Sequence, residues 1–169
     1  MVNSYLSILR QLSNKQIKYI VAGGVACVLH GVERVTMGID LSLLMSEENI
    51  KSFLIVMKDL GMIPRAPVPA EFLLSEDNRR IMREEKGALV FSFWNPTDPL
   101  LVVDVFLSEN HSYEELNKDA IKISLEEIEI QIISLDKIIA IKESIIPPRS
   151  KDIFDLQVLM EIRGKNING

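Results

Sequence analysis

The apolar residues in the first third of the chain recur with the period of a helix. Residues 4–13 carry leucines on one face, which predicts an amphipathic helix. The same period returns between Ser46, a residue type that caps helix N-termini, and Gly61, a residue type that ends helices. Between these two helices we expect a buried strand at 17–22 and a short helix at 23–31, opened and closed by glycines.

The rest of the chain is dominated by strand patterns. Branched and aromatic residues predict strands at 39–45, 88–94, 100–108, 120–124 and 128–134. The strand at 100–108 is apolar on both faces, so we expect it in the middle of a sheet. Three prolines make 62–75 a loop, residues 78–87 fit a short polar helix, and two further helices follow Ser134 and begin near Ser150. The order predicts an α/β (α+β) fold: a mixed β-sheet flanked by helices, with a helical C-terminal end.

Composition narrows the class of protein. At 169 residues we expect a single domain spanning 1–169. Cys27 is the one cysteine and lies in an apolar run, so a buried thiol is expected. We expect a soluble, cytoplasmic protein without membrane contact, because no signal peptide or run of about twenty apolar residues is present. The net charge of -5 argues against a broad nucleic-acid surface.

Two aspartates interrupt otherwise apolar strands. Asp104 sits in "LLVVDVF", where a carboxylate is costly unless it is hydrogen-bonded, paired or bound to a metal. A partner amide or arginine explains it as well as a metal does. Asp40 lies in a strand that would pair naturally beside that of Asp104, which would bring both carboxylates to one face. Clustered carboxylates suit Mg²⁺, often as two ions in phosphoryl transfer.

A glycine pair and an inward-facing lysine add to this picture. Gly23 and Gly24 stand between a strand and a helix, where backbone amides can approach a phosphate, although many such turns use glycine for steric reasons alone. Lys142 falls on the apolar stripe of its helix. Its ammonium either reaches the rim of the core or points into a phosphate cleft.

The segment "PPRSKDIFDLQVL" opens the last helix with several charges. Lys151 and Asp155 are four residues apart, which a surface ion pair explains. Arg149 and Asp152 fit simple helix-end effects.

Three segments together resemble the nucleotidyltransferase superfamily, in the bacterial minimal and abortive-infection branch related to the aminoglycoside nucleotidyltransferases. They are "YIVAGGVACVLHGVERVTMGIDLSLLM", "VVDVF" and "ISLDKIIAIKESIIPPRSKDIFDLQVL". The family pattern has paired glycines, an "HG" turn, an arginine and a threonine, then a strand with two acids one residue apart. A later third acid and a closing element "K…R-x-KD…D" complete it. The resemblance covers about residues 19–160.

The resemblance implies a role for each matching residue. Gly23 and Gly24 would hold the phosphates of a nucleotide, and Lys142 would contact them. Asp40 would ligate Mg²⁺, and Asp104 would complete the metal site and help to deprotonate an acceptor hydroxyl. Six further residues match the family text and are given structural or rim roles: Arg34, Thr36, Arg149, Lys151, Asp152 and Asp155.

Gly38 departs from the family pattern. It stands where the family has its first metal-binding aspartate. In an extended strand its side chain would share a face with Asp40 and Ser42. No neighbour on that face replaces the missing acid.

Two functions of different classes follow. The first is Mg²⁺-dependent transfer of a nucleoside monophosphate from an NTP to a hydroxyl on a small molecule, an RNA end or a protein, impaired by Gly38. The second is a catalytically silent nucleotide- or partner-binding module, as one half of a toxin–antitoxin pair. Position 38 favours the second function, and the rest of the motif favours the first.

Overall fold

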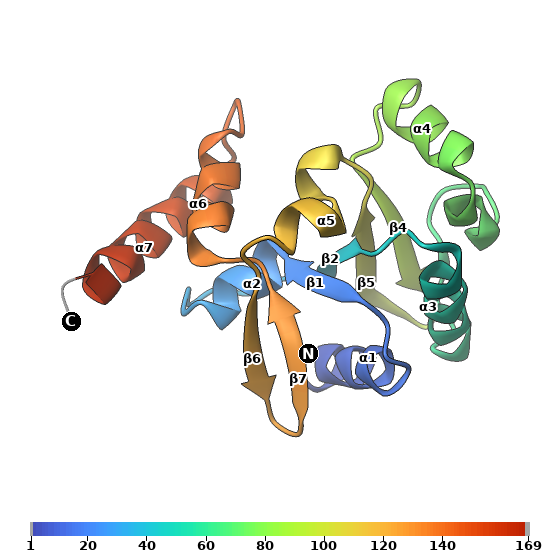
Figure 1. Ribbon diagram of the computed structural model, residues 1–169, viewed down its shortest axis with the longest axis horizontal. Coiled ribbons are helices and arrows are strands. Elements are labelled where there is room, and N and C mark those ends of the chain that lie inside the picture. Colours follow the sequence, from blue (N-terminus) through green and yellow to red (C-terminus); the bar gives the residue numbers. More distant parts are fainter. Residues whose placement is uncertain (1, 168–169) are drawn as a thin grey trace.

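A computed structural model describes residues 2–167 of the chain, and its strands form one mixed sheet (Figure 1). The strands are β1 Tyr19–Ala22, β2 Ile39–Leu43, β3 Ile63–Pro64, β4 Val90–Asn95, β5 Asp98–Phe106, β6 Ile121–Leu125 and β7 Ile128–Ile132. Their order across the described sheet is β3-β4-β5-β2-β1-β7-β6. The predicted α/β class is confirmed, and β5 has strands on both sides, as its apolar faces indicated.

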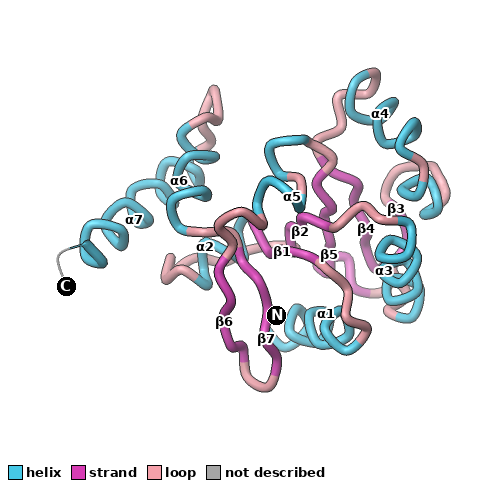
Figure 2. The backbone as a smooth tube through the Cα atoms, viewed as in Figure 1, coloured by secondary structure: helices cyan, strands magenta, loops and turns pink. Residues whose placement is uncertain are grey.

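Helices precede, interrupt and follow the strands (Figure 2). They are α1 Val2–Asn14, α2 Gly23–Leu29, α3 Glu47–Asp59, α4 Glu76–Glu84, α5 Tyr113–Leu116, α6 Leu135–Glu143 and α7 Ser150–Ile167, with 3-10 turns η1 at Ala70–Leu74 and η2 at Glu109–His111. The hydroxyl of Ser46 accepts a hydrogen bond from the backbone of Asn49, so the predicted cap is present, and the hydroxyl of Ser134 likewise accepts one from Lys137 at the start of α6.

Short elements were missed by the sequence patterns. The predicted loop 62–75 contains β3 and η1, because Leu73 is fully buried and anchors the turn to the core. Helix α5 was also missed; it is a single turn capped by Ser112, with Leu116 buried. Segments this brief show too few apolar positions to reveal a period.

The two faces of the central strands differ in chemistry. Apolar side chains of β2, β4 and β5 point to a core under α3, where the rings of Phe53 and Phe93 meet edge to face at 5.6 Å. The opposite face carries Asp40 and Asp104, because β2 pairs with β5 in parallel at that register. The core thus fixes the strands that present the acids.

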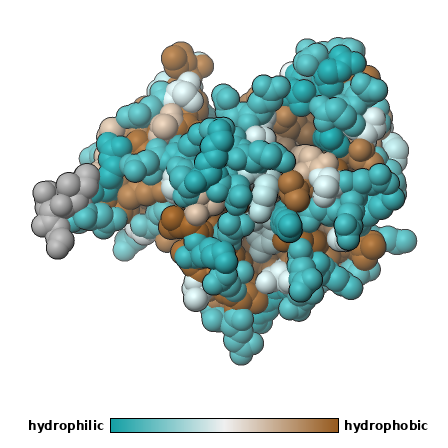
Figure 3. Space-filling view, viewed as in Figure 1, coloured by the Kyte–Doolittle hydropathy of each residue, from teal (hydrophilic) through white to brown (hydrophobic). Residues whose placement is uncertain are grey.

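Helices α6 and α7 pack against each other and form an arm at one side of the sheet. Figures 1 and 2 show this arm on the far side of the molecule from α3 and α4. The space-filling view in Figure 3 shows a mainly hydrophilic face on which hydrophobic side chains form separate groups. Within residues 2–167, no helix combines the length and apolar character needed to cross a bilayer.

Candidate functional site

Asp40 and Asp104 lie opposite each other on adjacent strands. The register of β2 and β5 pairs these two residues directly, so their side chains share one face of the sheet. The predicted adjacency of the two strands is therefore confirmed. Both residues are half-buried, and the hydroxyl-bearing Ser92 of β4 lies opposite Asp104 on its other side.

The electrostatics of this pair favour a bound cation. Burial and the neighbouring charge of Asp104 raise the pKa of Asp40 to about 6, although a hydrogen bond from the Gly24 amide and the charge of Lys151 act in the opposite direction. The Oδ1 atom of Asp104 is one of two buried side-chain polar atoms in the described residues without a hydrogen-bond partner. Oxygen ligands with uncompensated charge are what Mg²⁺ prefers, so the residues present fit this ion.

The glycine pair lies against the carboxylates. Gly23 has a positive φ of 56°, and a Cβ there would overlap the Asp40 carboxylate and lie 2.8 Å from its Cβ. The amide of Gly24 donates to Oδ2 of Asp40 at 3.2 Å from the first turn of α2, which begins at Gly23. On the other side of Gly24, a Cβ would lie 2.5 Å from Oγ1 of Thr36. Gly23 is therefore required for close packing of the turn on the acid, and Gly24 for close packing of the turn on Thr36.

Gly38 lies in a bend before β2 and is not part of the strand. Its φ is +93°, a backbone conformation that favours glycine, and its amide donates to the hydroxyl of Tyr5 at 2.6 Å. An added Cβ would lie 3.2 Å from the Val102 carbonyl oxygen and 3.3 Å from the Val102 Cβ. Strand alternation alone does not describe this position, because the chain turns there.

Lys142 faces the interior, as its place on the apolar stripe predicted, and its ammonium is buried in ion pairs. Its side chain is 8% exposed, and its Nζ pairs with Asp152 at 3.1 Å and with Asp155 at 2.8 Å. The predicted rim position is wrong because two carboxylates of α7 stabilise the ammonium inside the arm. The predicted surface pair of Lys151 and Asp155 is also wrong, since Asp155 is fully buried.

Asp155 connects the arm to the body of the protein. Its Oδ2 accepts from Arg34, at 2.5 Å, and from the thiol of Cys27, at 3.8 Å. Cys27 is buried, as predicted, and this burial raises its pKa to about 12. Arg34 lies in the segment between α2 and β2, and Cys27 lies within α2, so one carboxylate joins the arm to α2 and to the segment that follows it.

The charges of two cations near the start of α7 act on Asp40. The charge of Lys151 lowers the pKa of Asp40, and that of Asp40 contributes to the raised pKa of Arg149. Arg149 is 62% exposed and forms an ion pair with Asp152. Burial acts to raise the pKa of Asp152, but the hydrogen bonds from Arg149 and Lys142 outweigh it and lower this pKa to about 2. From the sequence, these cations were given only rim roles. Their position directly after the two prolines, at the start of a helix, was the feature that could have drawn attention to them.

Within the described residues, no group of three or more His, Cys, Asp or Glu side chains is arranged to hold a metal ion. The site contains two carboxylates, Asp40 and Asp104.

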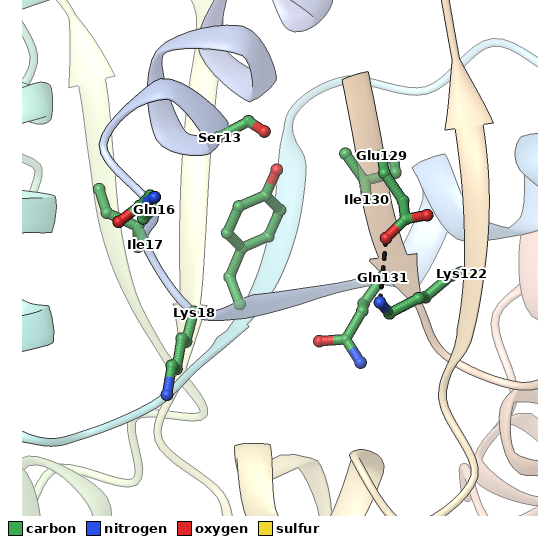
Figure 4. A pocket seen from close by; sticks show the side chains of 9 residues that line it. Ser13, Gln16, Ile17, Lys18, Lys122, Glu129, Ile130 and Gln131 are labelled. Carbon is green, nitrogen blue, oxygen red and sulfur yellow. Dashed lines mark ion pairs between the residues drawn. The ribbon is translucent and has the colours of Figure 1, made fainter. Parts of the chain in front are cut away.

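A pocket of about 630 Å³ lies at the Tyr19 end of β1 (Figure 4). Ala22, the residue of β1 that pairs with Asp40, is at the opposite end of this strand. Lys18 lies on one side of it, and the ion pair of Lys122 with Glu129, at 3.0 Å, lies on the other. This pocket is separate from the carboxylate pair.

Comparison with known proteins defines the fold. No protein-family model matches the chain, and no curated protein sequence matches it. Among solved structures, the chain is similar to the lincosamide antibiotic adenylyltransferase LnuA in its lincomycin-bound crystal structure. The TM-score is 0.65 at 15% sequence identity, and the match covers 96% of this chain and 98% of that one. The chain therefore has a nucleotidyltransferase-like fold over nearly its whole length.

Proposed function

We propose that this protein transfers a nucleoside monophosphate from an NTP to a hydroxyl acceptor in an Mg²⁺-dependent reaction. The observation that carries the proposal is the pairing of Asp40 with Asp104 beside a glycine turn whose amide contacts the pair. The similarity to an adenylyltransferase supports it.

Each residue has a place in the proposed reaction. Asp40 and Asp104 would hold Mg²⁺, which when bound supplies positive charge to the phosphates. The turn at Gly23 and Gly24 admits the triphosphate close to the backbone, and Lys151 adds a cation on that side. The acceptor oxygen bonds to the α-phosphorus, the bond to the β-phosphate oxygen breaks, and pyrophosphate leaves. The hydroxyl proton passes to the carboxylate pair, where Oδ1 of Asp104 has no other partner.

Lys142 has a positioning role in this proposal. Its ion pairs hold Asp152, and Asp152 holds Arg149, the residue just before α7. In this proposal the lysine acts on the phosphates indirectly, through Asp152 and Arg149.

A second candidate is a catalytically silent nucleotide- or partner-binding module, as in a toxin–antitoxin pair. The observation that favours it is Gly38, which leaves two carboxylates at the site where the family pattern has three. The cytoplasm, where NTP and Mg²⁺ are abundant, suits both candidates.

Incubation of the protein with each labelled NTP, Mg²⁺ and a panel of hydroxyl acceptors separates the candidates. We expect slow transfer of labelled nucleotide with release of pyrophosphate. The panel includes lincomycin, a small-molecule acceptor class suggested by the ligand of the similar structure. NTP binding by calorimetry without any transfer, even in the Gly38→Asp variant, would favour the silent module.

A further inference from the structure

The carboxylate pair has different surroundings on its two sides along the sheet. Toward β1 lies the glycine turn, whose Gly24 amide contacts Asp40, and the positive charge of Lys151 acts on the same carboxylate. Toward β4 the sheet continues with Ser92 opposite Asp104 and with Trp94 opposite Val102. Because phosphates require amides and cations, the nucleotide belongs on the β1 side, which leaves the β4 side for the acceptor.

The β4 side of this face is apolar. Trp94, Val102 and Ile63 share the face of Asp104, because Trp94 is the cross-strand partner of both Val102 and Ile63. We call these three residues the apolar strip. Trp94 and Val102 are half-buried, and Ile63 is 47% exposed. Within the described residues, none of the three belongs to the core or to the half-buried hydrophobic side chains that pack against it.

Gly38 lies against the end of the strip that is near the acids. A Cβ at this position would lie 3.3 Å from the Cβ of Val102, so a side chain there would crowd the strip.

We propose that the acceptor carries an apolar ring face, aromatic or fused alicyclic, next to its reacting hydroxyl, and that this ring lies on the apolar strip. The proposal rests on the proposed function. Trp94 is the diagonal neighbour of Asp104, because its partner Val102 lies two residues before Asp104; this diagonal spans about 7–8 Å, roughly the span of one ring. A ring stacked on the indole thus leaves its hydroxyl beside Ser92 and Asp104.

The test uses Trp94 as its own reporter, since the chain has one tryptophan and its indole N–H gives a single NMR signal. The probes are phenyl β-D-glucoside and methyl β-D-glucoside, which carry the same hydroxyls with and without a ring, added without NTP or Mg²⁺. We expect the phenyl compound to shift the indole signal and to bind about three- to tenfold more tightly than the methyl compound. Equal affinity of the two glucosides, or an unmoved indole signal, overturns the proposal.

A matched pair of variants locates the binding. Ile63→Thr changes the strip, whereas Ile55→Thr makes the same change on α3 at a residue of similar exposure, 53%. We expect the preference for the phenyl compound to fall in Ile63→Thr and to persist in Ile55→Thr. Equal loss in both variants contradicts the assignment. If ATP alone shifts the indole signal as strongly as the phenyl compound does, the strip binds the nucleotide, and this result also overturns the proposal. Because the binding assay contains no NTP, failure of nucleotide transfer leaves its result unaffected.

Discussion

Gly38 matters for the proposed function because its backbone and its missing side chain both bear on the candidate site. It adopts a φ of +93°, a conformation that residues with a side chain adopt only at a cost in energy. Under the proposed function, this is the position at which a third carboxylate would stand.

We expect Gly38→Asp to raise nucleotide transfer and lower stability. A third carboxylate would add to the charge that holds Mg²⁺, and a metal-site carboxylate is worth on the order of a hundredfold or more in rate. The positive φ and the contact with Val102 should cost about 1–2 kcal/mol of unfolding free energy. Labelled-NTP transfer and urea denaturation measure the two effects.

Gly38→Asn is the control for this change, because it has nearly the same shape without the charge. It should lose similar stability and gain no rate. If the natural chain transfers as fast as Gly38→Asp, the acid at 38 is dispensable and the role given to the position is wrong.

Gly23 offers a test of the glycine turn. Gly23→Ala would drive a methyl group into the Asp40 carboxylate and should weaken binding of NTP with Mg²⁺ by tenfold or more, on the order of 1–2 kcal/mol. Gly87→Ala introduces the same residue at a similar φ of 63° with no atom within 4 Å, so it carries the backbone cost alone. Calorimetric NTP affinities that are equal in the two variants would reduce Gly23 to a turn residue.

At the residue scale, the sequence revealed the acids better than the cations. An aspartate inside an apolar strand is visible because burying its charge is costly. Asp155 was misplaced because its spacing of four residues from Lys151 does not say which helix face is buried, whereas the apolar stripe correctly turned Lys142 inward. The partners of Asp155, Arg34 and Lys142, lie 121 and 13 residues away from it, and helix periodicity says nothing about such contacts.

At the scale of elements, long apolar segments were predictable and short ones were not. The strand around Asp104 was placed at the centre of the sheet because it is apolar on both faces, and β5 lies there. β3 and α5 contain two and four residues, too few for a periodic pattern. Their positions depend on contacts with the finished sheet.

The arm of α6 and α7 depends on a buried ion network, which Lys142→Met tests. The change leaves Asp152 and Asp155 with less compensation in the interior and should cost about 3–5 kcal/mol. Lys51→Met is the control, since it breaks an exposed pair with Glu47 and should leave the unfolding free energy almost unchanged. Urea denaturation compares both; equal stability of the two variants would mean that the network contributes little.

At the scale of the whole molecule, the two faces of the central strands have different roles. One face of the central strands is sealed by the core, and the other holds two acids between a polar turn and an apolar strip. The acid pair lowers the free energy of unfolding, and the packing of the core must offset this cost. Such a trade of stability for function is typical of functional sites.

The pH dependence of stability measures that cost. The pKa of Asp40 is about 6 in the folded protein and 3.8 as its ordinary value, so the folded state disfavours the ionised form. The penalty is fully present above pH 6 and is lost as pH falls from about 6 to about 4. Asp40→Asn should accordingly raise the unfolding free energy at pH 8 by about 2–3 kcal/mol, and the gain should disappear near pH 4.

Asp77→Asn, at a side chain 83% exposed, controls for the loss of one negative charge and should show no such pH-dependent gain. Mg²⁺ supplies the second arm of the experiment. At pH 8 it should raise the unfolding temperature of the natural chain and of Asp77→Asn, but not that of Asp40→Asn, because only a chain with both carboxylates gains a bound ion on folding. Should Asp40→Asn match the natural chain in stability across this pH range, the acid pair is not under electrostatic strain. Its readiness to take a cation would then require another cause.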